Sequence, residues 1–176
     1  EDFVSGYKNW FLSYRFDNTP VAIKYQKGLL FCPKGEANME RMEEYVNDGE
    51  YRAYQHFISN SKWDYEGLQM QVAQDTSKLL NGQKERTGLA VGYIVDESGH
   101  LKKGKKSVAV SRQYAGVIGK VDNAQVGVYS SLVNGSSTSI INERLFLPEV
   151  WAKNKARCGE AKIPEDFQVF KTRSEE

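Results

Sequence analysis

Asp96 is the residue whose type and setting most clearly suggest chemistry. It follows the apolar run 89–95 and precedes Glu97, so we expect it to close a buried strand. A carboxylate at a strand end is well placed to hold a divalent cation, because the strand fixes its Cα while its oxygens face a cleft. Such a cation activates water and stabilises phosphoryl transfer. Residues 96–99 also have the composition of an ordinary turn, and one carboxylate does not make a site.

A block of basic residues follows Asp96 closely. No acidic residue occurs between Ser98 and Val121, and this stretch contains Lys102, Lys103, Lys105, Lys106, Arg112 and Lys120. A local basic block attracts phosphate even though the net charge of the chain is only +1. Arg112 and Tyr114 belong to a strand-like segment, and basic side chains beside an aromatic one suit a nucleic-acid backbone. Most lysine clusters are solvated loops, so that interpretation stays open as well.

Other kinds of site find little support in the sequence. Cys32 and Cys158 have no CxxC partner, so neither a disulfide framework nor a zinc site is expected, and a reducing cytoplasm fits this usage. His56 and His100 are not spaced as metal ligands; His56 is expected to pack on a helix, and His100 is not assigned as a general base. No P-loop, GxSxG or GxGxxG motif is present. No run of about 18 apolar residues predicts a membrane span.

Two halves with different hydrophobic periods must position these residues. Up to about residue 85 the pattern predicts helices. The expected helices are 3–14, 21–30, 39–46 with Asn38 as N-cap, 50–58, and a last one from a Ser61 cap to Asn81-Gly82. The helix pair 39–58 is either a DNA-reading unit or ordinary helical packing. Ordinary packing fits its acidic surface better, since Arg52 is the one basic residue of its second helix.

The second half has the pattern of an antiparallel sheet. Strand-like runs occur at 89–95, 107–110, 125–133 and 139–147, followed by a short helix at 151–157. Asn134-Gly135 between two such runs predicts a hairpin. The sequence therefore predicts an α+β protein with a helical domain at 1–87 and a sheet domain at 88–176.

The run "VDESGHLKKGKKSVAVSRQYAGVIGKVDNAQVGVYSSLVNG", residues 95–135, closely resembles bacterial insertion-sequence transposases of the DDE superfamily endonuclease group. The segment "ERLFLPEVWA" at 143–152 is similar to their E-L-Y-L-P-x-x-W segment. The helical stretches "NMERMEEYV" and "YRAYQHFISNSKWD" are similar to their N-terminal region. Two departures stand out: His100 replaces a frequent aromatic residue, and Ala109 replaces a frequent glycine.

The resemblance implies the first antiparallel strands of a ribonuclease-H-like catalytic core. Asp96 would be the first acidic residue of the catalytic triad and a metal ligand, and the hairpin 125–147 would supply the next two strands. No match to the second Asp or to the Glu is found before Glu176, and Asp122, Glu143 and Asp166 match other parts of the pattern. Mg²⁺ or Mn²⁺ is therefore expected only with the complete triad.

The resemblance also implies partners and a location. Double-stranded DNA at transposon ends would contact Lys102, Lys103, Lys105, Lys106, Arg112 and Tyr114. The region 1–87 would help recognise DNA ends or form a homodimer, without any membrane association. The expected location is the bacterial cytoplasm, in association with DNA.

The ends of the chain suggest that it is part of something longer. It begins at Glu1 rather than Met and ends in a charged run at Glu176, so we expect an N-terminal portion of a transposase. Such a portion would be inactive or nearly so on its own. The alternative is a truncated DNA-binding or inhibitory module without catalysis.

Overall fold

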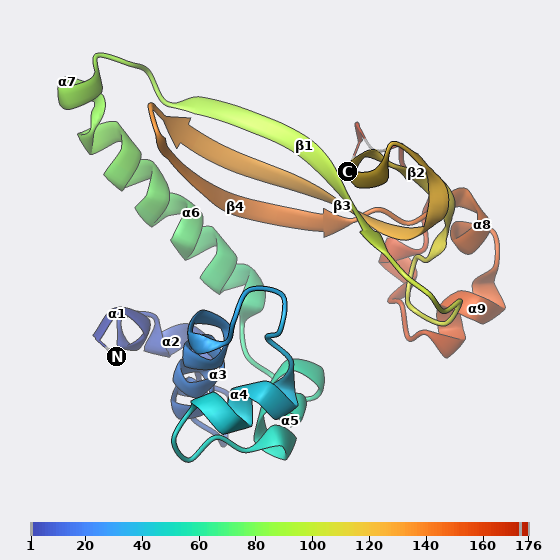
Figure 1. Cartoon of the computed structure of the whole chain (residues 1–176), viewed down its shortest axis with the longest axis horizontal. Coiled ribbons are helices and arrows are strands. Elements are labelled where there is room, and N and C mark those ends of the chain that lie inside the picture. The colour runs from blue at the N-terminus through green and yellow to red at the C-terminus, as the bar shows by residue number, and fades with distance from the viewer. Residues whose placement is uncertain (1, 173, 176) are drawn as a thin grey trace. The chain divides into compact units, whose positions relative to one another are not determined.

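The computed structural model describes residues 2–172, 174 and 175 and divides into two compact units (Figure 1). The first unit extends to Gln71 and is helical, and the second extends from Val72 and contains the sheet. Helices and antiparallel strands are both present, which confirms the α+β class. The units divide within a long helix, whereas a domain boundary at residue 87 stays a prediction.

The helical unit packs around aromatic side chains. One cluster is built on Phe11, Ala22 and Phe57, and Trp63 stacks on Phe57 with ring centroids 5.3 Å apart. A second cluster is built on Cys32, Met42 and Tyr54. The helices of this unit are α1 (Asp2–Ser5), α2 (Lys8–Phe11), α3 (Thr19–Phe31), α4 (Met39–Tyr45), α5 (Tyr51–Ser59) and the first part of α6 (Tyr65–Gly82).

Helix starts follow the capping side chains. Asn38 caps α4 as predicted, because its Oδ1 accepts from the Arg41 backbone N–H at 3.0 Å. The predicted cap at Ser61 is wrong. Asp64 accepts from the Gly67 N–H at 2.8 Å and starts α6, whereas the Ser61 hydroxyl contacts His56 Nδ1 at 3.0 Å.

The predicted helix 3–14 is also wrong in extent. It is divided into α1 and α2, and Tyr14 lies outside both helices with 97% of its surface exposed. Gly6 lies at the break, where its backbone freedom disfavours a continuous helix.

The sheet is organised around β3 (Lys120–Asn134), which pairs antiparallel with each of the other strands. These are β1 (Gly92–Leu101), β2 (Ser111–Ala115) and β4 (Ser137–Leu145). Short helical turns, α7 (Lys84–Thr87) and η1 (Gly116–Ile118), precede β1 and β3. The antiparallel sheet predicted for this half is therefore confirmed.

The hairpin between β3 and β4 is confirmed, with a shift of one residue. Asn134 pairs with Ser137, so the turn itself is Gly135-Ser136, and Gly135 has φ 60°. A first turn residue with positive φ is typical of the type II′ hairpin, in which glycine is unstrained. Asn134 is free to hold other segments, and its Nδ2 donates to the Leu89 carbonyl at 3.1 Å.

β1 differs from the prediction at the point that matters most. It continues through residues 96–101, which pair with residues 124–129 of β3, so neither a turn at 96–99 nor a strand end at Asp96 is correct. Asp, Ser and Gly are usual in turns, but here the long strand β3 provides backbone pairing partners for them. Glycine suits position 99, because an added Cβ would lie in tight contact with Ala115 Cβ, 3.1 Å away.

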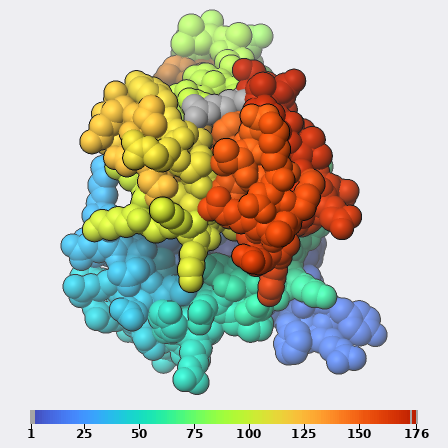
Figure 2. All heavy atoms as spheres, turned by 90° about the vertical axis from the view of Figure 1, so that its right-hand side faces the viewer, coloured from blue at the N-terminus to red at the C-terminus, as the bar shows by residue number. Residues whose placement is uncertain are grey.

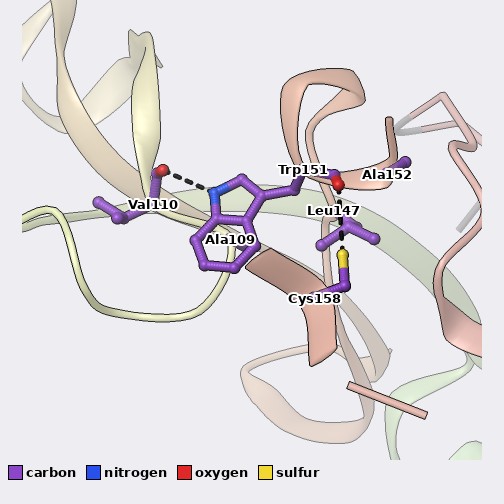
Figure 3. Packing of buried hydrophobic residues seen from close by; sticks show 6 residues of the cluster. All are labelled: Ala109, Val110, Leu147, Trp151, Ala152 and Cys158. Carbon is purple, nitrogen blue, oxygen red and sulfur yellow. Dashed lines mark hydrogen bonds between the residues drawn. The ribbon is translucent and has the colours of Figure 1, made fainter. Parts of the chain in front are cut away.

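The predicted strand at 107–110 is likewise wrong. Ala109 has φ 59° and, with Val110, is buried in a cluster beside the sheet. The other buried members are Leu147, Trp151, Ala152 and Cys158, drawn in Figure 3.

The predicted helix at 151–157 is instead two short helices, α8 (Glu149–Ala152) and α9 (Lys155–Glu160), and η2 (Glu165–Phe167) follows them. Asn154 separates the two helices by capping α9, since its Oδ1 accepts from the Arg157 N–H at 3.0 Å.

Within the described residues, no helix is both long and apolar enough to cross a membrane.

Candidate nucleic-acid interface

Asp96 lies in the middle of β1 and is exposed to solvent. Its Oδ1 accepts from the neighbouring Glu97 N–H at 2.8 Å. It pairs across the sheet with Tyr129, which pairs in turn with Glu143. Directly paired residues point to the same face of a sheet, so these three side chains form one row. Asp96 therefore presents its carboxylate on an open sheet face.

Among the residues that the structure describes, the carboxylates do not form a two-metal site. Asp96 and Glu143 lie two strand spacings apart, about 10 Å between Cα atoms, with Tyr129 of β3 between them. Asp122 forms an ion pair with Lys120, and Asp166 lies in η2. Across the described ranges no group of three or more His, Cys, Asp or Glu side chains is arranged to hold a metal ion.

A pocket brings Asp96 and Tyr114 together. Its volume is about 350 Å³, and Gly99, Val117 and Val126 also contribute to its wall. Tyr114 lies on β2 and is half exposed. The sequence singled out both residues for different reasons, and the fold places them around one hollow.

The basic loop, residues 102–106, leaves the end of β1 without regular secondary structure. All five residues are exposed, and its yellow-green segment projects from the surface in Figure 2. In the part of the chain that the structure describes, none of its four ammonium groups forms an ion pair. Four unpaired positive charges are therefore presented to solvent within five residues.

The backbone of this loop is held by side chains from elsewhere. Asn123 Nδ2 donates to the carbonyls of Lys102 at 2.6 Å and Gly104 at 2.8 Å. The Asn123 carbonyl accepts from the Lys102 N–H at 2.9 Å. Arg157 Nη2 donates to the Lys105 carbonyl at 2.8 Å. The loop is therefore irregular in secondary structure but anchored at three of its carbonyls.

The segment after the loop is anchored in the same way. Gln125 Nε2 donates to the Val108 carbonyl at 2.5 Å, and Trp151 Nε1 donates to the Val110 carbonyl at 2.8 Å (Figure 3). The Arg157 guanidinium lies over the Trp151 ring, 3.7 Å from its centroid, a favourable cation–π arrangement. The buried cluster around Trp151 thus supports the base of the basic loop.

Arg112 is connected to the basic loop through Asn123, which is its cross-strand partner in β3. Asp96 is further away. Lys102 directly follows the end of β1, six residues after Asp96, which corresponds to about 20 Å at 3.3 Å per residue of strand. The basic loop and Asp96 therefore cannot contact the same phosphate.

His100 is occupied by a neighbour on the sheet. Its Nε2 lies 2.9 Å from the Tyr129 hydroxyl, and the two rings meet edge to face. An aromatic residue at position 100 would make a similar ring contact.

Asn123, Gln125, Trp151 and Arg157 were not singled out by the sequence. Asn123 lies 19 residues from Gly104, and Arg157 lies 52 residues from Lys105. No local pattern predicts such contacts, because they depend on the β3 register and on the position of α9.

Comparison with known proteins places the chain in a family. Residues 21–175 match the family described as DDE superfamily endonuclease. The chain is also 30% identical, over 127 residues, to a protein named probable transposase for insertion sequence element IS701 from Microchaete diplosiphon. That alignment covers 72% of this chain and 32% of the relative, so the chain aligns with about a third of the relative's length. No solved structure matches the chain significantly.

The chain therefore belongs to the DDE superfamily endonucleases. The similarity to DDE-type insertion-sequence transposases that the sequence indicated is confirmed.

Proposed function

We propose that this chain is part of a DNA transposase that cleaves and joins the ends of a mobile element by two-metal phosphoryl transfer. The observation that carries the proposal is the basic loop, whose four unpaired ammonium groups stand on an anchored backbone beside the strand of Asp96. Family membership supplies the reaction class. Fold alone does not fix function, so the loop chemistry is the independent support.

Each predicted residue then has a role. Lys102, Lys103, Lys105, Lys106 and Arg112 bind the DNA backbone, and Tyr114 contacts a base or sugar beside the pocket. Asp96 is one metal ligand of a ribonuclease-H-like core. Since the described carboxylates do not complete the site, the other ligands for Mg²⁺ or Mn²⁺ come from outside the described residues. The helical region up to residue 87 recognises DNA ends or forms a homodimer. The protein is located in the bacterial cytoplasm, where it is associated with DNA.

The spacing of the site sets a geometric expectation for the DNA. About 20 Å between Asp96 and Lys102 corresponds to roughly six base-pair steps of duplex, at 3.4 Å each. The lysines therefore contact backbone that lies several nucleotides from any phosphate near Asp96.

Salt dependence of DNA binding tests the proposal. The affinity of the chain for a short labelled duplex is measured in increasing salt, for wild type and for a variant with all four loop lysines changed to alanine. Each lost phosphate contact reduces the slope of log K against log salt by about 0.9, so four contacts reduce it by about 3.6. This difference amounts to roughly 150-fold between about 50 and 200 mM salt.

A charge-matched variant provides the control. Lys78, Lys84, Lys153 and Lys171 are exposed lysines of the sheet unit outside the basic loop, and changing them to alanine removes the same total charge. This control is expected to retain most of the wild-type slope. Equal slopes for wild type and the four-lysine loop variant would contradict DNA-backbone binding by the loop.

A second candidate function is a DNA-binding or inhibitory module without catalysis. The absence of a three-residue metal cluster from the described residues favours it for this chain taken alone. A cleavage assay with duplex DNA and Mg²⁺ or Mn²⁺ separates the two cases. We expect no cleavage by this chain alone, and Asp96-dependent cleavage would show that it is catalytically complete.

A further inference from the structure

We infer that Asn123 and Arg157 are positioning residues for DNA binding, which hold the basic loop in one backbone conformation so that its lysines meet successive phosphates. The inference rests on the proposed function, because it assumes that the loop lysines bind DNA. It assigns roles to two residues, one on β3 and one on α9, that need not contact DNA themselves.

The anchored carbonyls of the basic loop do not need protein partners. Residues 102–106 are all exposed, so water can satisfy their backbone groups. Asn123 nevertheless uses its side-chain amide on two of these carbonyls, and Arg157 contacts a third. Protein donors on water-accessible carbonyls fix a conformation, whereas water does not.

The charge of Arg157 is directed toward the protein. Its guanidinium lies over Trp151 and donates to the Lys105 carbonyl. Arg157 is half-buried and lies in the first turn of α9, where its backbone N–H donates to the capping residue Asn154. These contacts orient the guanidinium toward the loop backbone and not toward the exposed lysine side chains.

Asn123 also links the basic loop to Arg112. Asn123 pairs with Arg112 across β2 and β3, and its side chain donates to the basic loop. The position of Asn123 therefore fixes the loop relative to Arg112. An anchored loop loses less conformational entropy when it binds than a free loop does. Removing the anchors should therefore weaken binding without removing any positive charge.

The experiment uses the whole chain with Asn123→Ala, which removes both donors and leaves the net charge unchanged. Asn142→Ala, on β4, is the matched control, because the hydrogen bond of Asn142 Oδ1 within the described residues comes from the adjacent Glu143 N–H. Arg157→Lys is the second variant, which retains the charge but loses the planar donor and its stacking. Thermal unfolding of each variant identifies the folded ones.

Two readouts are expected to change together. Backbone NMR order parameters of the loop without DNA should fall from about 0.85 in wild type to below about 0.6 in Asn123→Ala. Affinity for a short duplex of arbitrary sequence should fall about tenfold, with a smaller salt slope. Arg157→Lys should show a smaller change in the same direction, and Asn142→Ala should match wild type.

A mutant cycle separates positioning from general destabilisation. In a chain that already lacks the four loop lysines, Asn123→Ala should cause no further loss of affinity, because its effect acts through them. Wild-type order parameters and affinity in a folded Asn123→Ala or Arg157→Lys variant would overturn the inference. If the four-lysine change itself has no effect on binding, the proposed function fails, and the inference fails with it.

Discussion

The two units of this protein bury their side chains in different ways. The helical unit encloses its aromatic clusters, and Tyr54 and Phe11 are almost completely buried there. In the sheet unit the cluster around Trp151 lies at the side of the strands, whereas β1 leaves Tyr93 and Val95 more than half exposed. The comparison shows that packing in the sheet unit supports an irregular basic segment, while the strand that carries Asp96 remains open.

The largest expected effect is on the cluster beside the sheet. Trp151→Ala removes a buried ring, its hydrogen bond to Val110 and its contact with Arg157. We expect a loss of about 3–5 kcal/mol in unfolding free energy, measured by denaturant titration. Val150→Ala, on the same helix and 62% exposed, is the control and should change it by less than about 0.5 kcal/mol. Similar effects of the two changes would contradict the assigned core.

A smaller effect is expected from the helical unit. A Cβ at Gly28 would lie 2.6 Å from Met42 Cγ, so Gly28→Ala overpacks the contact between α3 and α4. The expected loss is about 1–3 kcal/mol, and Met42→Ala in the same chain should recover part of it. Gly82→Ala, where an added Cβ meets no atom within 4 Å, is the control. An unchanged denaturation midpoint for Gly28→Ala would show that α3 and α4 pack less closely.

Ala109 offers a test in which two effects nearly cancel. Its φ of 59° costs about 1–2 kcal/mol for a residue with a Cβ. Its buried methyl group contributes about 0.8 kcal/mol, and glycine adds chain entropy to the unfolded state. Ala109→Gly should therefore change the unfolding free energy by less than about 1 kcal/mol. A loss above about 2 kcal/mol would show that the methyl contact dominates.

Alkaline pH provides the smallest effect, confined to the helical unit. Burial raises the pKa of Tyr54, and Glu43 and Cys32 add to the shift. The unfolded chain releases this proton near pH 10, so the contribution of Tyr54 is present below that pH and is lost as pH rises further. Tyr54→Phe should reduce the fall in melting temperature between about pH 8 and pH 11, whereas Tyr14→Phe, at an exposed site, should not. An equal fall in melting temperature for wild type and Tyr54→Phe would contradict this role of the Tyr54 hydroxyl.

The features that the sequence predicted depend on neighbouring residues. Asn38 caps α4 through a residue three positions away, and Asn134-Gly135 marks the hairpin because the turn is local. The strand through Asp96 extends beyond its prediction because β3 supplies partners about 30 residues later. The hydrogen bonds from Asn123 and Arg157 to the basic loop depend on tertiary packing. The sequence therefore identified the basic loop, but it did not predict the residues that anchor its backbone.

The most direct test of the central claim is lysine footprinting. The chain is treated with an acetylating reagent, with and without duplex DNA, and the modification of each lysine is measured by mass spectrometry. Lys102, Lys103, Lys105 and Lys106 should react readily in the free chain and be protected by DNA, while Lys78 and Lys153 react equally in both. Equal modification of the four loop lysines with and without bound DNA would contradict the account.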